Sequence, residues 1–193
     1  MAHLTREDLL SLEKYAEVRD DFRRKVMDHK KARALPLGPN ATLYFEDALT
    51  MQYQIQEMLR IERTFEPAGI QEELDVYNPL IPDGSNWKAT FMIEYEDVEE
   101  RQRKLAELTG IEDKVWVQVG ENPKVYAIAN EDLERTTAEK TSSVHFLRFE
   151  LDEKMAADAK SGLAIRAGID HPAYKCETTA PEEVRASLVK DLA

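Results

Sequence analysis

The segment KATFMIEY (residues 88–95) alternates apolar and polar side chains, with Ala89, Phe91, Ile93 and Tyr95 at every second position. This period of two places the four side chains on one face of a β-strand. Strands with one apolar face are typical of a largely antiparallel sheet that is covered on one side. Similar apolar runs predict further strands at 41–46, 115–119, 124–129, 143–151 and 163–169.

Other segments have apolar side chains at helical spacing. The longest, residues 5–33, begins with Thr5 as its expected N-cap and ends in a basic turn. The segment 50–65 also has helical spacing, although its first part could equally be a strand. We therefore expect a single α+β domain over residues 1–193, in which the long N-terminal helix packs on a largely antiparallel sheet. Further short helices are expected at 69–77, 97–108 and 152–160, and at the C-terminus after a capping box at 179–182.

Composition excludes several classes of function. The chain of 193 residues carries 26 Lys and Arg against 38 Asp and Glu, a net charge of −12. A dedicated nucleic-acid-binding protein needs basic residues to displace counterions from phosphates, so we expect no nucleic-acid partner. One cysteine excludes an intrachain disulfide and a Cys-rich metal site. Glycine spacings match neither a phosphate-binding loop nor a dinucleotide fingerprint. No segment is apolar enough for a signal peptide or a membrane span, which predicts a cytoplasmic protein without a membrane partner.

Three cationic side chains fall on the apolar stripe of the first helix. Arg19, His29 and Arg33 share this stripe with Tyr15 and Val26. Most simply, they form ion pairs with carboxylates at the rim of the core. Alternatively, they form a basic pocket for an anion or an acidic substrate.

Two glutamates lie on or beside the apolar face of the second helix. A buried Glu62 would need a partner, because an unpaired carboxylate is costly to bury, and Arg19 or His29 could supply it if the two helices pack together. Glu57 lies one position off the apolar stripe. Either glutamate could act as a general acid or base, although a structural salt bridge is the simpler interpretation.

Two histidines stand near predicted strands. His145 shares an apolar strand face, where a histidine is usually a core residue with satisfied hydrogen bonds, and His171 follows a strand in the segment 170–174. As an alternative, His145, His171 and Tyr174 could converge with Glu57 and Glu62 in one pocket. Iron, manganese and zinc all accept histidine and carboxylate ligands, so His145, His171 and Glu57 are the candidate metal ligands.

Five segments are characteristic in combination and span nearly the whole chain. They are Tyr15-x3-Arg19-x2-Phe22, YQIQEM (53–58), the segment that begins Glu73-Leu74-x2-Tyr77 and ends NPLIP (78–82), SVHF-x-RF (143–149) and DHPAY (170–174).

Together these segments resemble the bacterial family known as domain of unknown function 3501. Members of that family are typically encoded beside rubrerythrin-like and iron–sulfur proteins, which implies an accessory or binding protein in iron or oxidative-stress physiology and a protein partner from such a system. The family supplies no catalytic residues to transfer. A small metal-dependent enzyme with a His/Glu site is the alternative hypothesis, and the oligomeric state stays open.

Overall fold

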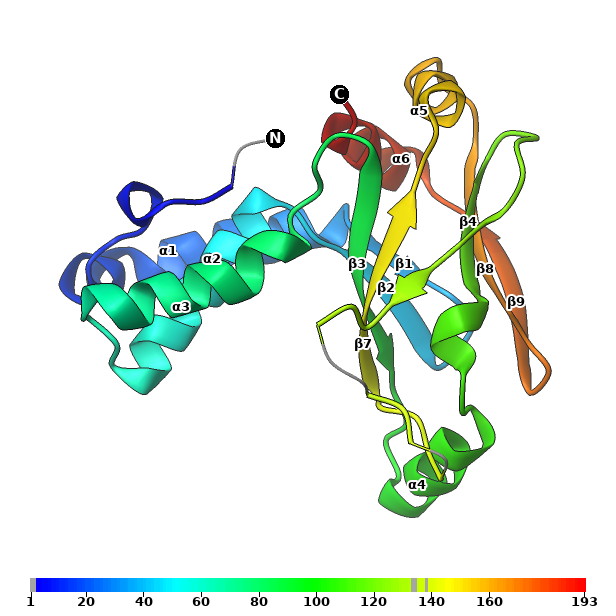
Figure 1. Cartoon of the computed structure of the whole chain (residues 1–193), viewed down its shortest axis with the longest axis horizontal. Coiled ribbons are helices and arrows are strands. Elements are labelled where there is room, and N and C mark those ends of the chain that lie inside the picture. Colours follow the sequence, from blue (N-terminus) through cyan, green and yellow to red (C-terminus); the bar gives the residue numbers. More distant parts are fainter. Residues whose placement is uncertain (1–2, 133–134, 138) are drawn as a thin grey trace.

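The computed structural model describes residues 3–132, 135–137 and 139–193, and its strands form two antiparallel sheets. The α+β class is thus confirmed, with the strands divided between two sheets (Figure 1). The five-stranded sheet has the order β1 (Ala34–Pro36), β2 (Ala41–Phe45), β3 (Asn86–Ile93), β7 (Val144–Glu150) and β6 (Ile128–Ala129). The four-stranded sheet has the order β5 (Val125–Tyr126), β4 (Val115–Val119), β8 (Ile165–His171) and β9 (Tyr174–Thr179).

The hydrophobic core lies between the two sheets. From β3 it takes the predicted face of Ala89, Phe91 and Ile93, all at most 2% exposed. The four-stranded sheet contributes Val117 and Ala167 to this core. These two residues pair across β4 and β8 and are fully buried. Each sheet therefore buries one face against the other, as the alternating pattern predicts.

The chain changes sheets within one predicted strand. We expected residues 124–129 to form a single hairpin arm. Instead, β5 pairs with β4 in the four-stranded sheet, and after Ala127 the chain enters the other sheet as β6, paired with β7. One extended segment thus links both sheets at their edges.

Three helices form an arm that extends away from the sheets (Figure 1). The helices are α1 (Leu12–Lys31), α2 (Ala48–Glu62) and α3 (Pro67–Tyr77). The arm has its own small apolar cluster, in which Ile55 and Leu59 of α2 meet Leu74 of α3. The helix α1 packs along α2 and reaches the five-stranded sheet at its C-terminal end.

The first helix begins later than expected. Thr5 bonds with Asp8 around a separate 3-10 turn (Arg6–Asp8), and Ser11 is the N-cap of α1. The reason lies in α2, where the buried Gln56 side chain accepts from the backbone nitrogen of Leu10 at 2.6 Å and donates to its carbonyl at 3.3 Å. These two bonds occupy the backbone groups that a continuous helix would use.

The second segment of the arm is helical throughout. Asp47 caps α2 by accepting from the backbone nitrogen of Thr50 at 3.0 Å, so the strand alternative for 50–55 is wrong. The helix ends at Glu62, and the following residue, Arg63, caps it in a left-handed conformation with φ 56°. Pro67 then begins α3 rather than ending α2, in line with the preference of proline for the first helical turn.

The remaining helices cover the two ends of the sheets. They are α4 (Val98–Glu107) at one end, and α5 (Glu153–Lys160) and α6 (Glu182–Leu188) at the other (Figure 1). Trp87 of β3 donates to the Leu188 carbonyl at 2.9 Å and ties α6 to the core. The expected capping box at 179–182 is wrong, because α6 has Pro181 at its N-cap position and no side-chain cap. No helix in the described ranges is both long and apolar enough to cross a membrane.

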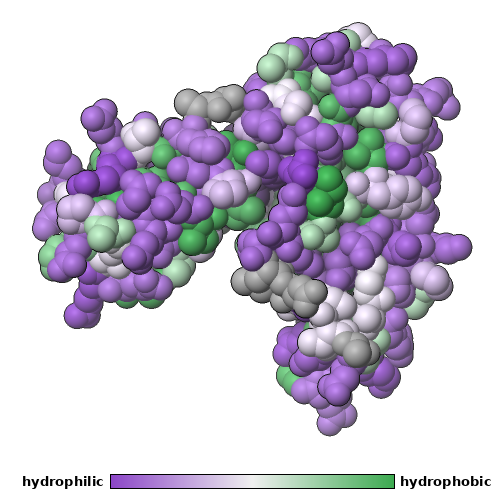
Figure 2. All heavy atoms as spheres, in the orientation of Figure 1, coloured by the Kyte–Doolittle hydropathy of each residue, from purple (hydrophilic) through white to green (hydrophobic). Residues whose placement is uncertain are grey.

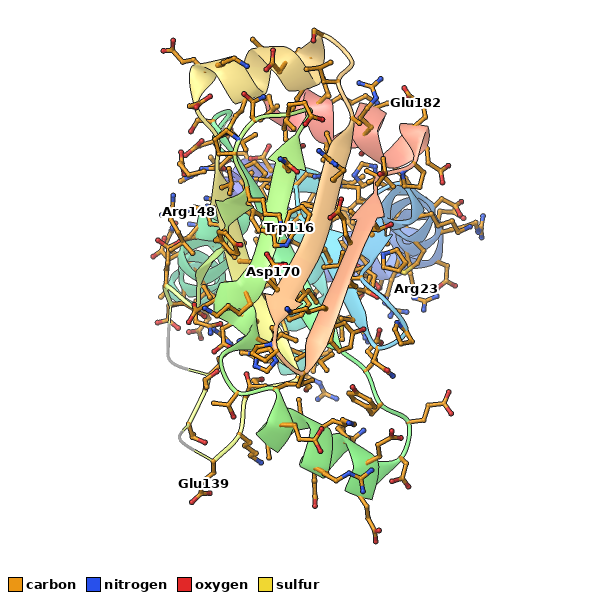
Figure 3. The ribbon with its side chains drawn as sticks, turned by 90° about the vertical axis from the view of Figure 1, so that its right-hand side faces the viewer. Arg23, Trp116, Glu139, Arg148, Asp170 and Glu182 are labelled. Carbon is orange, nitrogen blue, oxygen red and sulfur yellow. The ribbon has the colours of Figure 1, made fainter. Side chains whose placement is uncertain are left out.

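The outer face of the four-stranded sheet carries a tryptophan that is sealed by its neighbours. Trp116 of β4 lies near the centre of this face together with Asp170 (Figure 3). It is 1% exposed, with the Lys124 ammonium 3.8 Å from the ring centroid. Lys124 and Tyr126 both donate to Asp170, at 2.9 and 2.8 Å. Beneath the indole lies Gly168, where a Cβ would stand 2.4 Å from Cζ2 of Trp116.

Candidate functional site

The outer face of the five-stranded sheet carries a cluster of mostly apolar side chains beside the polar Thr42, Lys88 and Arg148. Tyr44, Thr90 and Phe146 pair across β2, β3 and β7, and Met92 pairs with Val144 in the next row. All five side chains point away from the core and are only partly exposed. An antiparallel sheet normally turns polar side chains to this side, so a partly covered apolar surface here is informative.

The helical arm overhangs this surface and encloses a hollow, which we call the elbow groove. An inner cavity of about 370 Å³ and an outer cavity of about 640 Å³ share the side chains of Tyr77, Leu80 and Phe146. Apolar surface is visible in the angle between the arm and the sheets (Figure 2). Both volumes fall within the range of small-molecule sites. The inner cavity is also lined by Lys30, Tyr44, Glu46, Met51, Gln54, Thr90, Met92 and Val144.

Glu46 brings a carboxylate into the inner cavity. It follows β2, is 5% exposed, and accepts a hydrogen bond from the Thr90 hydroxyl at 2.6 Å through Oε1. Its carboxylate forms no ion pair with any described residue. The second oxygen, Oε2, also has no hydrogen-bond partner among the described residues. In the described ranges, Trp116 Nε1 is the one side-chain polar atom that is both fully enclosed and without a partner. Oε2 is therefore partly accessible, and the Glu46 side chain lines the inner cavity.

Lys30 lines the same cavity from the last turn of α1. Its ammonium lies 6.0 Å from the ring centroid of Tyr53 and, among the described residues, makes no ion pair. The inner cavity thus holds one anionic and one cationic side chain, and neither is neutralised by the described protein groups.

The charged groups of the outer cavity have partners within the protein. Arg148 donates to Glu131 at 2.9 Å and also pairs with Glu150, and this guanidinium lowers the pKa of Glu131. The Lys88 ammonium donates to the Pro79 carbonyl at 2.6 Å, while burial lowers the pKa of this lysine. The outer cavity therefore offers shape and apolar surface but few unsatisfied charges.

Of the predicted site residues, Glu57 lies in the arm. Arg19 donates to both of its oxygens at 2.8 and 2.9 Å, and Tyr15 donates to Oε1 at 2.8 Å. These bonds, with Arg19 contributing most, lower the pKa of Glu57 to about 2. Such a carboxylate stays ionised and is a poor general base at neutral pH. Glu62 is exposed at the end of α2, so the expected pairing of a buried Glu62 with Arg19 or His29 is wrong.

His29 and Arg33 lie at the base of the arm in what we call the anchor cluster: His29, Arg33, Asp47 and Asp191. His29 bonds Asp47 at 2.5 Å, and Arg33 donates to Asp191 at 2.5 Å and to the Phe45 carbonyl at 2.9 Å. Burial raises the pKa of Asp191 to about 6. A cavity of about 420 Å³ adjoins the cluster. Arg19 is part of the separate pair in the arm, so the three anion-binding candidates do not form one basic pocket.

The two histidines are held by hydrogen bonds near the α4 end of the core. His145 is fully buried, with Thr141 Oγ1 2.9 Å from Nε2 and Glu112 3.9 Å away, and burial lowers its pKa. His171 contacts the Thr109 carbonyl through Nε2 at 3.2 Å. The position of Glu112 beside His145 was not anticipated, because nothing in the sequence links the two residues.

Tyr174 belongs to a strand rather than a loop. Within the segment 170–174, Asp170 and His171 end β8, residues 172–173 form the tight turn and Tyr174 begins β9, a strand that was not predicted. The Tyr174 hydroxyl donates to the Leu37 carbonyl at 2.7 Å and accepts from the Asn40 backbone at 3.1 Å. It therefore joins the edges of the two sheets.

The five residues of the predicted pocket do not converge. Glu57 and Glu62 are in the arm, whereas His145, His171 and Tyr174 have separate partners in the two sheets. The described residues contain no group of three His, Cys, Asp or Glu side chains able to hold a metal ion. The structure consequently offers no donor set for iron, manganese or zinc at Glu57, His145 and His171.

Sequence analysis missed the residues that line the elbow groove. One signal was present: Tyr44 and Phe146 occupy the positions of their strands that alternation assigns to solvent. Nothing in the sequence, however, places the arm over this face.

Comparison with known proteins agrees with the resemblance described above. The model of a family described as "Protein of unknown function (DUF3501)" matches residues 3–192. A solved structure from Burkholderia pseudomallei K96243, described as a novel protein of unknown function, is 53% identical, with full coverage of both chains and a TM-score of 0.95. A search of curated proteins finds no match. With nearly its whole length matched, the chain belongs to the DUF3501 family.

Proposed function

We propose that this protein is an accessory protein that binds a small ligand in the elbow groove. One observation carries the proposal: an apolar outer sheet face, roofed by the arm, borders two adjoining cavities of ligand size. A surface left apolar and hollow where solvent would favour polar groups indicates a binding function.

A binding role also fits the residues examined as catalysts. Glu57 is held ionised by Arg19, and His145 is enclosed in the core. General acid–base catalysis requires a group within reach of a substrate and with a pKa near the working pH. Neither residue combines access with such a pKa.

The family resemblance suggests the setting in which the protein works. We propose that it acts in the cytoplasm and that its partner is a rubrerythrin-like or iron–sulfur protein of iron or oxidative-stress physiology. Size-exclusion chromatography with the purified rubrerythrin-like protein of the same organism tests this partner. A stable complex is expected, and two separate peaks at tens of micromolar would contradict it.

The groove itself is tested with indole, a neutral apolar probe. In ¹H–¹⁵N NMR spectra, we expect indole at millimolar concentration to shift resonances of Tyr44, Tyr77 and Phe146. Phe146→Asp places a charge on the groove wall and should abolish these shifts. Phe65→Asp is the matched control, because Phe65 is 72% exposed at the end of the arm. Shifts that avoid the groove, or that survive Phe146→Asp, would refute the binding site.

A further inference from the structure

We infer that the inner cavity binds a zwitterion with an apolar body, whose ammonium group is bound by Glu46 and whose anionic group is bound by Lys30. This inference rests on the proposed function and names its ligand class. An amino acid with a large apolar or aromatic side chain is the simplest molecule of this kind.

The ammonium end is assigned from Glu46. Glu46 as a residue is only 5% exposed, and a largely buried carboxylate is costly unless hydrogen bonds or a counter-ion compensate it. Among the described residues, the Glu46 carboxylate has one hydroxyl donor, Thr90, and no cation, and its second oxygen has no partner and is not fully enclosed. A ligand ammonium supplies three donors and the opposite charge, which would complete the coordination of this carboxylate.

The apolar body is assigned from the walls. Tyr44, Tyr77 and Phe146 contribute rings, and Met51 and Met92 contribute thioether chains that adapt to irregular shapes. Aromatic faces also favour a neighbouring ammonium group. A ligand with an aromatic or long aliphatic part would bury that part against these side chains.

The anionic end is assigned from Lys30. A ligand that carried only a positive charge would satisfy Glu46 but would be repelled by the Lys30 ammonium, and a purely anionic ligand would meet the reverse problem. Lys30 lines the cavity, is partly exposed and has no ion pair among the described residues. A zwitterion compensates both groups at once.

Three probes with the same phenyl body test this assignment by isothermal titration calorimetry. They are L-phenylalanine, phenethylamine, which lacks the carboxylate, and 3-phenylpropionate, which lacks the ammonium. We expect the wild-type protein to bind L-phenylalanine at least about tenfold more tightly than either single-charge analogue. Equal affinity for phenethylamine, or the absence of binding by all three at millimolar concentration, would overturn the inference.

Two substitutions assign the ends of the ligand. Glu46→Gln keeps an acceptor for Thr90 and should weaken L-phenylalanine and phenethylamine about tenfold while sparing 3-phenylpropionate. Lys30→Met should weaken L-phenylalanine and 3-phenylpropionate while sparing phenethylamine. Glu62→Gln and Lys31→Met, at exposed positions of the arm, are the matched controls and should change nothing.

The outcomes separate the inference from the function on which it rests. If indole binds in the groove but the charged probes show no preference, the groove remains a binding site and the zwitterion is wrong. If indole also fails to bind there, the proposed function falls with it. Should Glu46→Gln prove too unstable to purify, the ranking of the three probes on the wild-type protein still decides the question.

Discussion

The two sheets share one core but differ in their outer faces. On the four-stranded sheet, the large apolar side chain, Trp116, is sealed by Lys124 and seated on Gly168. On the five-stranded sheet, Tyr44 and Phe146 are roofed by the arm at a distance that leaves cavities. Both faces bear aromatic groups, yet Trp116 is enclosed by residues of its own sheet and of the adjoining turn, whereas Tyr44 and Phe146 are covered by a separate element.

This difference shows where the chain keeps apolar surface accessible. A ring packed directly on its neighbours stabilises the fold and has no room for a ligand. A sheet face that is covered by a helical arm at some distance keeps room for a ligand, provided that the base of the arm is held firmly. The anchor cluster supplies that hold, because it joins the end of α1 to the start of α2 and the C-terminal turn.

The largest expected effect comes from breaking the anchor cluster. Arg33→Met leaves Asp191 buried without its cation, which should lower the free energy of unfolding by about 3–5 kcal/mol in urea denaturation. It should also loosen the arm and weaken indole binding. Arg24→Met, at a side chain 73% exposed, is the control and should cost less than about 0.5 kcal/mol. Equal losses in the two variants would mean that Arg33 is not the anchor.

The same cluster gives the stability a dependence on pH. Burial raises the pKa of Asp191 from 3.8 to about 6, so its protonated form favours the folded state. This contribution is complete below about pH 4 and is lost as the pH rises through 6. Relative to Asp191→Asn, the wild type should therefore lose about 3 kcal/mol of unfolding free energy between pH 4 and 7. Chemical denaturation of both proteins at each pH measures this difference in unfolding free energy. A difference that stays constant between pH 4 and 7 would show that Asp191 has an ordinary pKa.

A smaller effect tests the sealed face. Gly168→Ala places a Cβ 2.4 Å from Cζ2 of Trp116 and 2.5 Å from the Cys176 carbonyl, so backbone or indole must move. We expect a loss of about 2 kcal/mol by chemical denaturation. Gly69→Ala, in α3, is the control, because alanine is favoured in a helix and the close contact of its Cβ, at 2.5 Å, is with the Cγ2 methyl group of Thr64 rather than with backbone or a tryptophan ring. If Gly168→Ala were as stable as Gly69→Ala, the close packing of this face would be refuted.

The smallest expected effect on stability comes from uncovering Trp116 on the outer face of the four-stranded sheet. Lys124→Ala removes the ammonium over the Trp116 ring and one donor to Asp170, at an expected cost of about 1 kcal/mol. Acrylamide should then quench Trp116 fluorescence, whereas the fully buried Trp87 stays protected. Lys175→Ala, on β9, is the comparison, and unchanged quenching in Lys124→Ala would show that other groups seal the ring.

Most of the fold was predictable, because alternation and helical spacing reflect burial on one side of an element. The face of Ala89, Phe91 and Ile93 was predicted correctly. The strand β9 was not predicted, because it lies at a sheet edge, where its side chains are only partly covered and its sequence shows little apolar alternation. The predicted start of α1 was wrong because the start is set by the Gln56 side chain, which is 46 residues from its partner Leu10 in the sequence.

The candidate site was much less predictable. Arg19 and Glu57 were recognised as odd, but their pairing depends on how α1 packs on α2. Glu46 was not predicted as a site residue, because a glutamate at the end of a strand is normally exposed. Here the helical arm covers it. The single-domain expectation and the partner remain predictions. What sequence reasoning lacked was the tertiary placement of the arm, which short-range patterns do not encode.

The change of sheets between β5 and β6 has a consequence for folding. Because one short segment pairs with β4 and then with β7, it ties the edges of the two sheets together. The two sheets should therefore open together, and amide hydrogen exchange in the central strands β3 and β8 should follow a single global unfolding event. The same segment continues into Glu131 and Asp132, which line the outer cavity. Part of the elbow groove wall thus belongs to the segment that links the two sheets.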